Sequence, residues 1–221
     1  MGFLTVLVLL ARPVHLTRHA RAEDWPQWRG PGRDAVWRAA GILNTLPPDG
    51  LKVSWRAAVG PGWSSPVVAG GRVYLADAEL RSPLARERVL CLDEATGKTL
   101  WAHSYQVAYP DWAFTGPGRG PTATPIIDAG RLYSVGLMGD LICFDAASSD
   151  VLWKKDLQKE YGIQEFSTNA SPLIESDLLI LFIGSAIAKS EACVVALDKT
   201  SGKEVWKALN ETVTASSPIV I

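Results

Sequence analysis

One phrase of the sequence occurs three times, and it restricts the possible folds more than any other feature of the chain. Its copies cover residues 89–101, 141–153 and 194–206, so they begin 52 and 53 residues apart. In every copy an aspartate is followed eight positions later by a tryptophan. A second phrase, which opens with Ser-Pro or Thr-Pro at residues 65, 124, 171 and 217, keeps a fixed order relative to the first. This periodicity indicates propeller blades or another repeat array.

The first repeat unit predicts four short antiparallel strands. Apolar and β-branched residues favour strands in four ranges, which are Pro66–Val68, Arg72–Asp77, Arg88–Asp93 and Lys98–His103. Gly70 and Gly71 provide the first turn, because glycine adopts positive φ without steric cost. We expect the Asp93 carboxylate to accept backbone N–H bonds in the last turn and thereby to fix the register of the last strand.

The tryptophans of the repeat are predicted to pack one unit against the next. Trp101, Trp153 and Trp206 hold one repeat position, and Trp55 holds it in a fourth copy carried by a lone outer strand over residues 52–57. The shared position favours a packing role over stacking on a ligand. We expect all four to be largely buried between units, except that an incomplete ring could uncover Trp55 or Trp206.

Counting the units predicts the fold class. Complete units lie near residues 64–107, 122–158 and 169–210, and a fourth begins at about residue 215. The expected fold is all-β, a β-propeller of four-stranded antiparallel blades with about three full blades and partial ones. Propellers usually have about 4–8 blades, so the ring is incomplete and the chain is interpreted as a fragment. Its end faces and the edge at 217–221 should then be apolar and exposed.

The repeat also resembles that of a known family. The pattern Ala-x-Asp-x-x-(Thr/Ser)-Gly-x-x-x-Trp is similar to the tryptophan-docking motif of pyrroloquinoline-quinone-like β-propeller repeats, and residues 196–206 match it fully. The first copy has Cys91 in place of alanine. The second has Ser149 in place of glycine, so its turn is expected to be strained or of another type. Residues 24–31 also resemble the opening of exported bacterial members.

The N-terminus is interpreted as a leader. Residues 3–11 form an apolar run of signal-peptide length, and Ala20-Arg-Ala22 offers a cleavage site. No Lys or Arg precedes the run, which leaves a misplaced start codon or an atypical leader as alternatives. The predicted organisation is a signal peptide over 1–22, an N-terminal extension over 23–50 and partial repeats over 51–221. The expected location is periplasmic or secreted.

No catalytic residue is predicted. His103 alone among the histidines lies outside the leader, and its place in a strand favours a structural role over a catalytic triad. Cys91 and Cys143 share a repeat position with Ala196, so they are interpreted as small buried thiols. Cys193 falls on the other strand face, and a disulfide is the less favoured interpretation. Cysteine and histidine spacings for covalent haem or zinc are lacking.

The cofactor-binding residues that the family resemblance implies can be compared with this sequence. The resemblance implies that quinone-dependent members hold the cofactor with two adjacent cysteines, a stacked tryptophan and calcium ligands. This sequence has no adjacent cysteines. Glu165, Asn169 and Glu175 are scattered and are interpreted as solvated loop residues, because calcium needs about six or more oxygen ligands. The prediction is no cofactor and no metal.

The leading functional hypothesis is a non-catalytic exported scaffold that binds a protein or peptide. The formal net charge of −1 offers no basic surplus for nucleic acid. The aromatic and glycine-rich loop over 107–121 is expected either to bind partners or to cap the central channel. One alternative is a fragment of a quinoprotein dehydrogenase whose cofactor residues lie elsewhere. Another is the sensor half of a membrane-anchored regulator.

Overall fold

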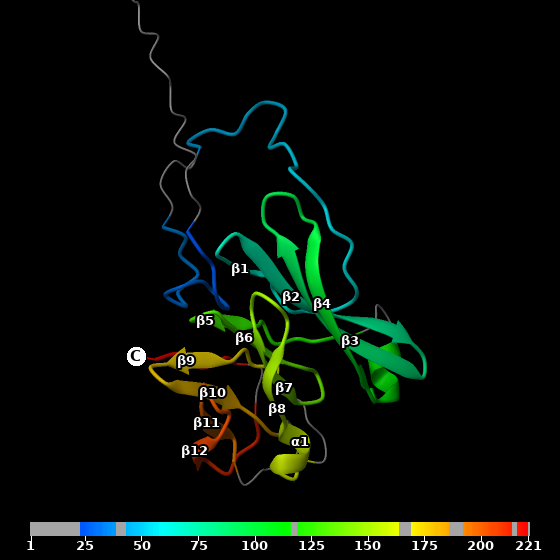
Figure 1. The fold of residues 1–221 in the computed structure, drawn as a ribbon, viewed down its shortest axis with the longest axis vertical. Helices are drawn as coiled ribbons and strands as arrows, with labels where there is room; N and C mark the ends of the chain where they lie inside the picture. The colour runs from blue at the N-terminus through cyan, green and yellow to red at the C-terminus, as the bar shows by residue number, and fades with distance from the viewer. Residues whose placement is uncertain are drawn as a thin grey trace, which may run out of the picture.

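The structure, a computed structural model, describes residues 23–38, 43–115, 119–163, 169–185, 192–213 and 216–220. The predicted leader and Glu165 lie outside these ranges. The described residues form three four-stranded antiparallel sheets, which follow one another along an arc with the second sheet between the first and the third (Figure 1). The predicted all-β propeller with an incomplete ring is confirmed.

Each sheet contains four strands in sequence order. The first sheet consists of β1 (Val67–Ala69), β2 (Arg72–Arg81), β3 (Leu84–Asp93) and β4 (Thr99–Val107). The second consists of β5 (Ile126–Asp128), β6 (Arg131–Val135), β7 (Asp140–Asp145) and β8 (Val151–Asp156). The third consists of β9 (Leu173–Glu175), β10 (Leu178–Phe182), β11 (Val194–Asp198) and β12 (Glu204–Ala208). Two short helical turns, η1 (Asp111–Phe114) and α1 (Leu157–Glu160), lie in the connections between sheets.

The turn before the last strand is the same in all three blades. In the first, the Asp93 carboxylate accepts hydrogen bonds from the backbone N–H and the hydroxyl of Thr96 at 2.8 and 2.6 Å. The glycines of the first and third turns have φ of 70° and 69°, and Ser149 has φ of 71° in the second. Ser149 therefore keeps the same turn type as the glycines, and the predicted strain is its left-handed backbone conformation.

Register follows from these turns. Cys91 pairs with Trp101 across β3 and β4, and Cys143 pairs with Trp153 across β7 and β8. Ala196 pairs with Trp206 in the third sheet. A register shift follows each of these pairs at the same place. The constant spacing of the sequence thus becomes a constant geometry in which each tryptophan stands opposite a small residue.

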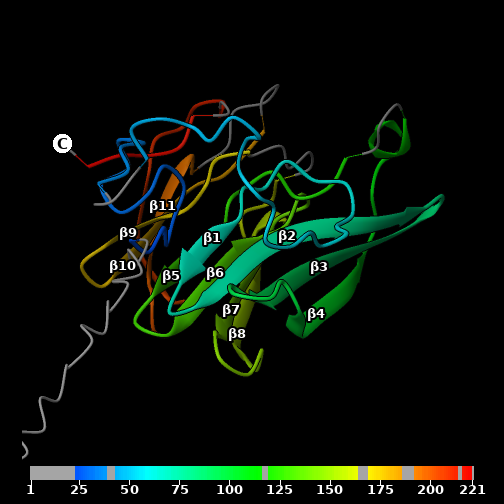
Figure 2. The same cartoon turned by 90° about the horizontal axis from the view of Figure 1, so that it is seen from above.

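Three sequence-based predictions about strands need correction. Residues 52–57 belong to no strand, because the described chain offers no neighbouring strand to pair with them. The fourth unit likewise forms no strand over 216–220. The β2–β3 hairpin is longer than predicted and projects beyond the other strands (Figure 2). Arg88 holds this extension together through ion pairs to Asp77 and Glu79 at 2.6 and 2.7 Å.

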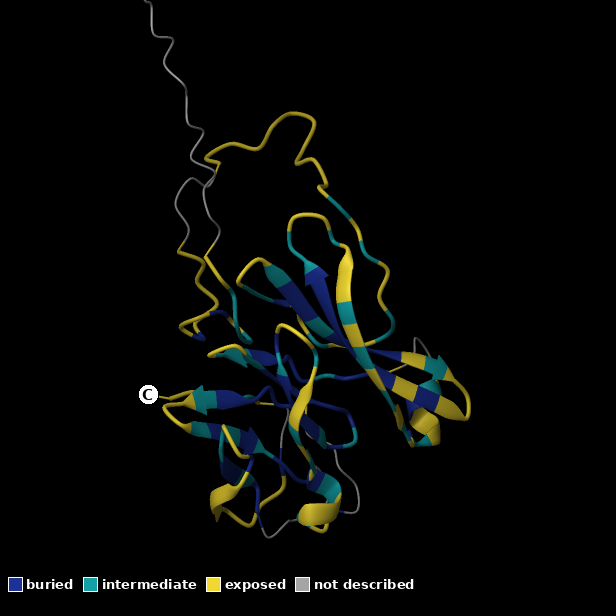
Figure 3. Cartoon of the chain, viewed as in Figure 1, coloured by how far each residue is buried: buried dark blue, intermediate teal, exposed yellow. Residues whose placement is uncertain are grey.

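The core lies between the sheets. Between the first and second, Tyr74 and Cys91 are buried in one cluster with Phe144. Between the second and third, Tyr133 and Leu179 are buried in another. Figure 3 shows buried residues concentrated on the inner parts of the sheets, with much of the outer strands exposed. Each blade therefore depends on its neighbour to bury its apolar face.

The N-terminal extension is attached to the first strands of the blades. Trp25 forms a two-way backbone pair with Val68 in β1, at 2.7 and 2.9 Å. The backbone N–H of Ile127 in β5 donates to the Pro26 carbonyl at 2.9 Å. The Arg33 guanidinium donates to the Pro172 carbonyl just before β9 at 2.9 Å. The extension thus crosses all three blades and links them.

Candidate functional site

The tryptophan indoles make the same contact with successive blades. Each indole N–H donates to the carbonyl of the residue that follows the turn aspartate in the next blade. The bonds are Trp55 Nε1 to Glu94 at 2.8 Å, Trp101 Nε1 to Ala146 at 3.1 Å, and Trp153 Nε1 to Lys199 at 3.2 Å. The turn glycine leaves room for the ring, since a Cβ on Gly202 would lie 2.8 Å from a Trp153 ring carbon.

A tyrosine reinforces two of these contacts. The hydroxyl of Tyr74 donates to the same Ala146 carbonyl as Trp101, at 3.1 Å. The hydroxyl of Tyr133 donates to the Lys199 carbonyl at 3.1 Å. In both cases the aromatic pair lies with ring centroids 5.9 Å apart. One turn carbonyl thus accepts two side-chain hydrogen bonds from the preceding blade.

The last tryptophan has no such partner. Trp55, Trp101 and Trp153 are half-buried, whereas Trp206 is 39% exposed. Its indole N–H donates no hydrogen bond to any residue that the structure describes. The partial burial of the first three agrees with the prediction, and the exposed Trp206 is the exception that the prediction allowed for an incomplete ring. The physical reason is that no described turn follows β12.

The whole of β12 is uncovered. All five of its residues are exposed, and the adjacent Leu209 is also exposed with φ of 65°. On β4 and β8, by contrast, alternate residues are half-buried against the following blade. We therefore take β12 together with Leu209 as the candidate interaction surface.

The Ser-Pro and Thr-Pro positions also connect the blades. The backbone N–H of Ser65 donates to the Thr124 hydroxyl at 3.1 Å, and that of Thr124 donates to the Ser171 hydroxyl at 2.9 Å. The backbone N–H of Ser171 continues the series to the Ser217 hydroxyl at 2.9 Å. This ladder explains the hydroxyl residues at positions 124, 171 and 217, a role that was not predicted from the sequence.

His103 lies on β4 and packs against the second blade. Its ring is half-buried and packs edge-on against Phe144, with ring centroids 4.9 Å apart. Burial, followed by the nearby Lys154 charge, lowers the pKa of His103. A neutral imidazole between two blades fits the packing role.

All three cysteines are buried free thiols, in agreement with the sequence-based interpretation. Burial raises the pKa of Cys91, Cys143 and Cys193. Protonated, buried thiols are poor nucleophiles and behave as small apolar groups.

Different parts of the loop over 107–121 fit the two predicted roles, a cap and a partner-binding surface. Tyr109 and Ala113 are buried in a small cluster with Leu137 of the second blade, which suits a cap. Trp112 is exposed, and the Arg119 guanidinium lies over its ring at 5.4 Å. Residues 116–118 lie outside the described residues.

A buried carboxylate between the first two blades escaped the sequence analysis. Glu87 is 1% exposed and accepts hydrogen bonds from Tyr105, from Tyr109 at 2.7 Å and from the Leu137 backbone N–H at 2.9 Å. Burial raises its pKa, and these donors oppose the rise. Glu87 lies in the hairpin extension, which has no counterpart in the other repeats, so the repeat comparison gave no signal for it.

Two of the three residues considered for a calcium site, Asn169 and Glu175, lie in described segments. Asn169 accepts a hydrogen bond from the Thr122 hydroxyl at 2.8 Å, and Glu175 lies exposed at the end of β9. The described residues contain no group of three His, Cys, Asp or Glu side chains able to hold a metal ion. The described residues therefore do not fit the ligand set that the family resemblance implies. No helix in the described ranges has the length and apolarity needed to cross a membrane.

Comparison with known proteins identifies the repeat. Residues 85–220 match the family model described as outer membrane protein assembly factor BamB, which is more than half of the chain. No curated protein sequence matches the chain.

Similar solved structures include enzymes and a BamB protein. The quinohemoprotein alcohol dehydrogenase of Comamonas testosteroni is 19% identical, with a TM-score of 0.60 over 84% of this chain and 27% of that one. A europium-containing methanol dehydrogenase is 21% identical, with a TM-score of 0.48 over 68% and 25%. BamB from Moraxella catarrhalis is 17% identical, with a TM-score of 0.35 over 67% and 46%. The chain thus spans about a quarter of each dehydrogenase, and the likeness to the first shows the fold alone.

Proposed function

The chain belongs to the family described as outer membrane protein assembly factor BamB, and from that premise we propose that it is a non-catalytic, exported propeller scaffold that binds a protein or peptide partner. The observation that carries the proposal is the uncovered β12, with Trp206 39% exposed where its three equivalents contact a following blade. An exposed apolar surface of this kind is typical of an interaction site.

The equivalent contacts indicate what the partner offers. Trp101 and Trp153 each place an indole against a turn and donate to its carbonyl. We infer that Trp206 does the same with a partner turn that presents a backbone carbonyl beside a glycine-sized gap. We also propose that all four tryptophans are docking elements in the sense of the family motif.

Export and domain organisation belong to the same proposal. Residues 1–22 act as a leader, 23–50 as an extension and 51–221 as partial repeats. The apolar run over 3–11 and the outer-membrane role in the family description support a periplasmic or secreted location. The attachment of Trp25 to Val68 supports an extension that stays with the folded protein.

Site-specific photo-cross-linking in cells tests the proposed surface. A photoreactive residue replaces Trp206, and a matched control replaces Lys159, which is exposed on α1. We expect a discrete protein adduct from position 206 and none from position 159. Equal adducts at both positions, or none at position 206, would refute binding through β12.

The alternative, a fragment of a quinoprotein dehydrogenase, stays a prediction supported by the fold likeness. Because this alternative places the cofactor residues outside the chain, its test is the thermal stability of the full gene product with pyrroloquinoline quinone and calcium, compared with each alone. A rise in the melting temperature that requires both would favour the enzyme. No change in the full gene product would leave the scaffold as the better proposal.

A further inference from the structure

The outer part of the β2–β3 hairpin, residues 78–87, has one covered face and one open face. Its strands pair with each other and with the end of β4 over residues 105–107. Successive side chains of a strand point to opposite faces of the sheet. On one face, Ala78 and Ala85 are buried in a cluster with Tyr109 of the loop over 107–121. The chain itself therefore covers that face.

The open face carries polar and charged side chains around a hollow of about 270 Å³. The exposed residues that line the hollow are Glu79, Arg81, Leu84, Arg86 and Gln106. β2 and β3 have ten residues each, whereas β6 and β10 have five. A neighbouring blade with strands as short as those of the second and third sheets would not reach this outer part, which projects beyond the other strands (Figure 2). The open face is thus available to a partner.

The acidic groups of this face already have a cationic partner. Arg88 pairs with the buried Asp77 at 2.6 Å and with Glu79 at 2.7 Å. With Arg81 and Arg86 included, the five charged side chains of the face carry a net charge of +1, whereas the whole chain carries −1. The positive charge that is left resides on Arg81 and Arg86.

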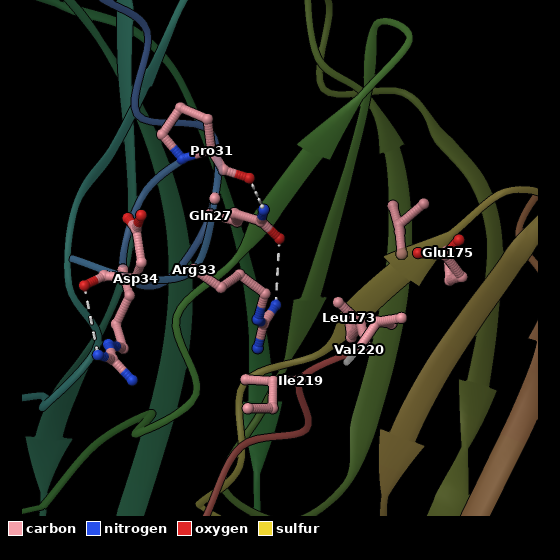
Figure 4. A pocket seen from close by; sticks show the side chains of 11 residues that line it. Gln27, Pro31, Arg33, Asp34, Leu173, Glu175, Ile219 and Val220 are labelled. Atoms are coloured by element: carbon pink, nitrogen blue, oxygen red, sulfur yellow. Dashed lines mark hydrogen bonds between the residues drawn. The ribbon is translucent and has the colours of Figure 1, made fainter. Parts of the chain in front are cut away.

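Arg81 and Arg86 are exposed cations with few contacts. Neither forms an ion pair with any residue in the described ranges, and Arg86 reaches only the Ser104 hydroxyl, at 3.4 Å. Arg33 is different, because it is 7% exposed and its guanidinium donates to Gln27 at 3.1 Å inside the N-terminal extension (Figure 4). The guanidinium groups of Arg81 and Arg86 are therefore free to bind carboxylates bidentately.

The strand register sets the spacing of the two cations. Arg86 lies opposite Glu79, and Arg81 lies opposite Leu84. Arg81 and Arg86 are therefore diagonal neighbours on one face, about 7–8 Å apart. In an extended peptide, side chains two positions apart point to the same side at about 6.5–7 Å. Two carboxylates with that spacing match the two guanidinium groups, and Leu84, 62% exposed, offers an apolar contact beside them.

We propose that the open face of the β2–β3 hairpin binds an extended acidic segment of a partner protein. Two carboxylates two positions apart in the segment pair with Arg81 and Arg86, and an aliphatic side chain of the segment contacts Leu84. The inference rests on the proposed partner-binding function. It assigns a second surface, on the first blade of the same scaffold, and the chemistry of what binds there.

Peptide binding to the whole chain tests the inference. The probe is a labelled serine–glycine octapeptide that has two aspartates two positions apart and a leucine two positions further on. Fluorescence anisotropy is measured at low salt, where exposed charges are weakly screened. We expect a peptide with asparagine at both positions to bind about tenfold more weakly. A peptide with adjacent aspartates should bind about threefold more weakly, because adjacent side chains point to opposite sides.

The peptide series can also contradict the inference. Equal binding of the three peptides, or no binding of any, overturns it. Displacement of the probe by a single-stranded DNA oligonucleotide at lower concentration than by unlabelled peptide would assign the face to phosphate groups instead, which also overturns it.

Variants locate the binding site. The double variant Arg81→Gln with Arg86→Gln keeps long polar side chains but removes both charges, so the affinity for the probe should fall about tenfold. Glu79→Gln removes a repelling carboxylate and should raise the affinity about twofold. The control Lys159→Gln removes a positive charge on α1 and should change the affinity less than twofold. Unchanged affinity in the double variant, or an equal loss in the control, overturns the assignment.

The two proposals can fail separately. An adduct at position 206 with no peptide binding would remove only the hairpin assignment. Peptide binding that depends on Arg81 and Arg86, without an adduct at position 206, would remove only the β12 surface.

Discussion

Replacing Gly202 with alanine tests how one blade is held to the next. Gly202 has φ of 69°, and an added Cβ would lie 2.8 Å from Trp153 Cε3. A left-handed alanine costs about 1–2 kcal/mol, partly offset by about 0.4–1 kcal/mol from a less flexible unfolded chain. Displacing the ring also loses its hydrogen bond to Lys199, about 0.5–1.5 kcal/mol, together with packing. We expect a total loss of about 2–3 kcal/mol.

Gly130→Ala is the matched control. Gly130 has φ of 77° in a turn of the second blade, and a Cβ there would meet nothing within 4 Å. It therefore reports the backbone strain alone, about 1 kcal/mol. The free energy of unfolding of both variants is measured in urea. A double-mutant cycle with Trp153→Leu should show that Gly202→Ala costs less once the ring is gone. Equal costs for the two glycine variants, or strict additivity in the cycle, would refute contact between the ring and the turn.

Three further predictions concern single sites. Ser149→Gly should raise the free energy of unfolding, measured by urea denaturation, by about 0.5–1 kcal/mol, because glycine removes the left-handed strain at φ of 71°. A lower free energy of unfolding would contradict this. Burial, followed by the Glu87 and Asp156 charges, raises the pKa of Asp140 to about 6. The folded protein therefore holds a proton that the unfolded chain releases, and the stabilisation present below about pH 4 is lost as the pH rises through about 6. The free energy of unfolding of Asp140→Asn should equal that of the parent near pH 4 and exceed it by about 1–2 kcal/mol near pH 7, after allowance for solvent screening. A free energy of unfolding equal to or below that of the parent near pH 7 would contradict this. Thiol titration of the denatured protein should find all three cysteines free, and a single free thiol would disprove it.

The repeated features of the fold could be predicted from the sequence. The constant spacing from Asp93 to Trp101 and its copies predicted four-stranded blades, and the repeat position shared by Cys91, Cys143 and Ala196 predicted a small buried residue. These features are local, since a turn and the strand after it are joined within a few residues. Repetition made them visible, because three copies of one pattern separate structural positions from variable ones.

The contacts that occur once could not be predicted in this way. Arg33 reaches Pro172 across 139 residues of sequence. Glu87 lies in a hairpin extension that the other blades lack, and its partners come from both blades. Neither residue belongs to a periodic pattern, and each acquires its environment only when distant segments fold together. The exposure of β12 was expected from the incomplete ring, but its use as a binding surface remains a proposal.

Solvent labelling of Trp206 tests partner binding through β12 most directly. Hydroxyl-radical footprinting compares the purified chain with the same chain in cells. Trp206 should be labelled strongly in the purified chain and weakly in cells, because a partner covers it there. Trp153, half-buried by the chain itself, should be labelled weakly in both, and the exposed Trp37 strongly in both. Equal strong labelling of Trp206 in both conditions would contradict a bound partner on β12.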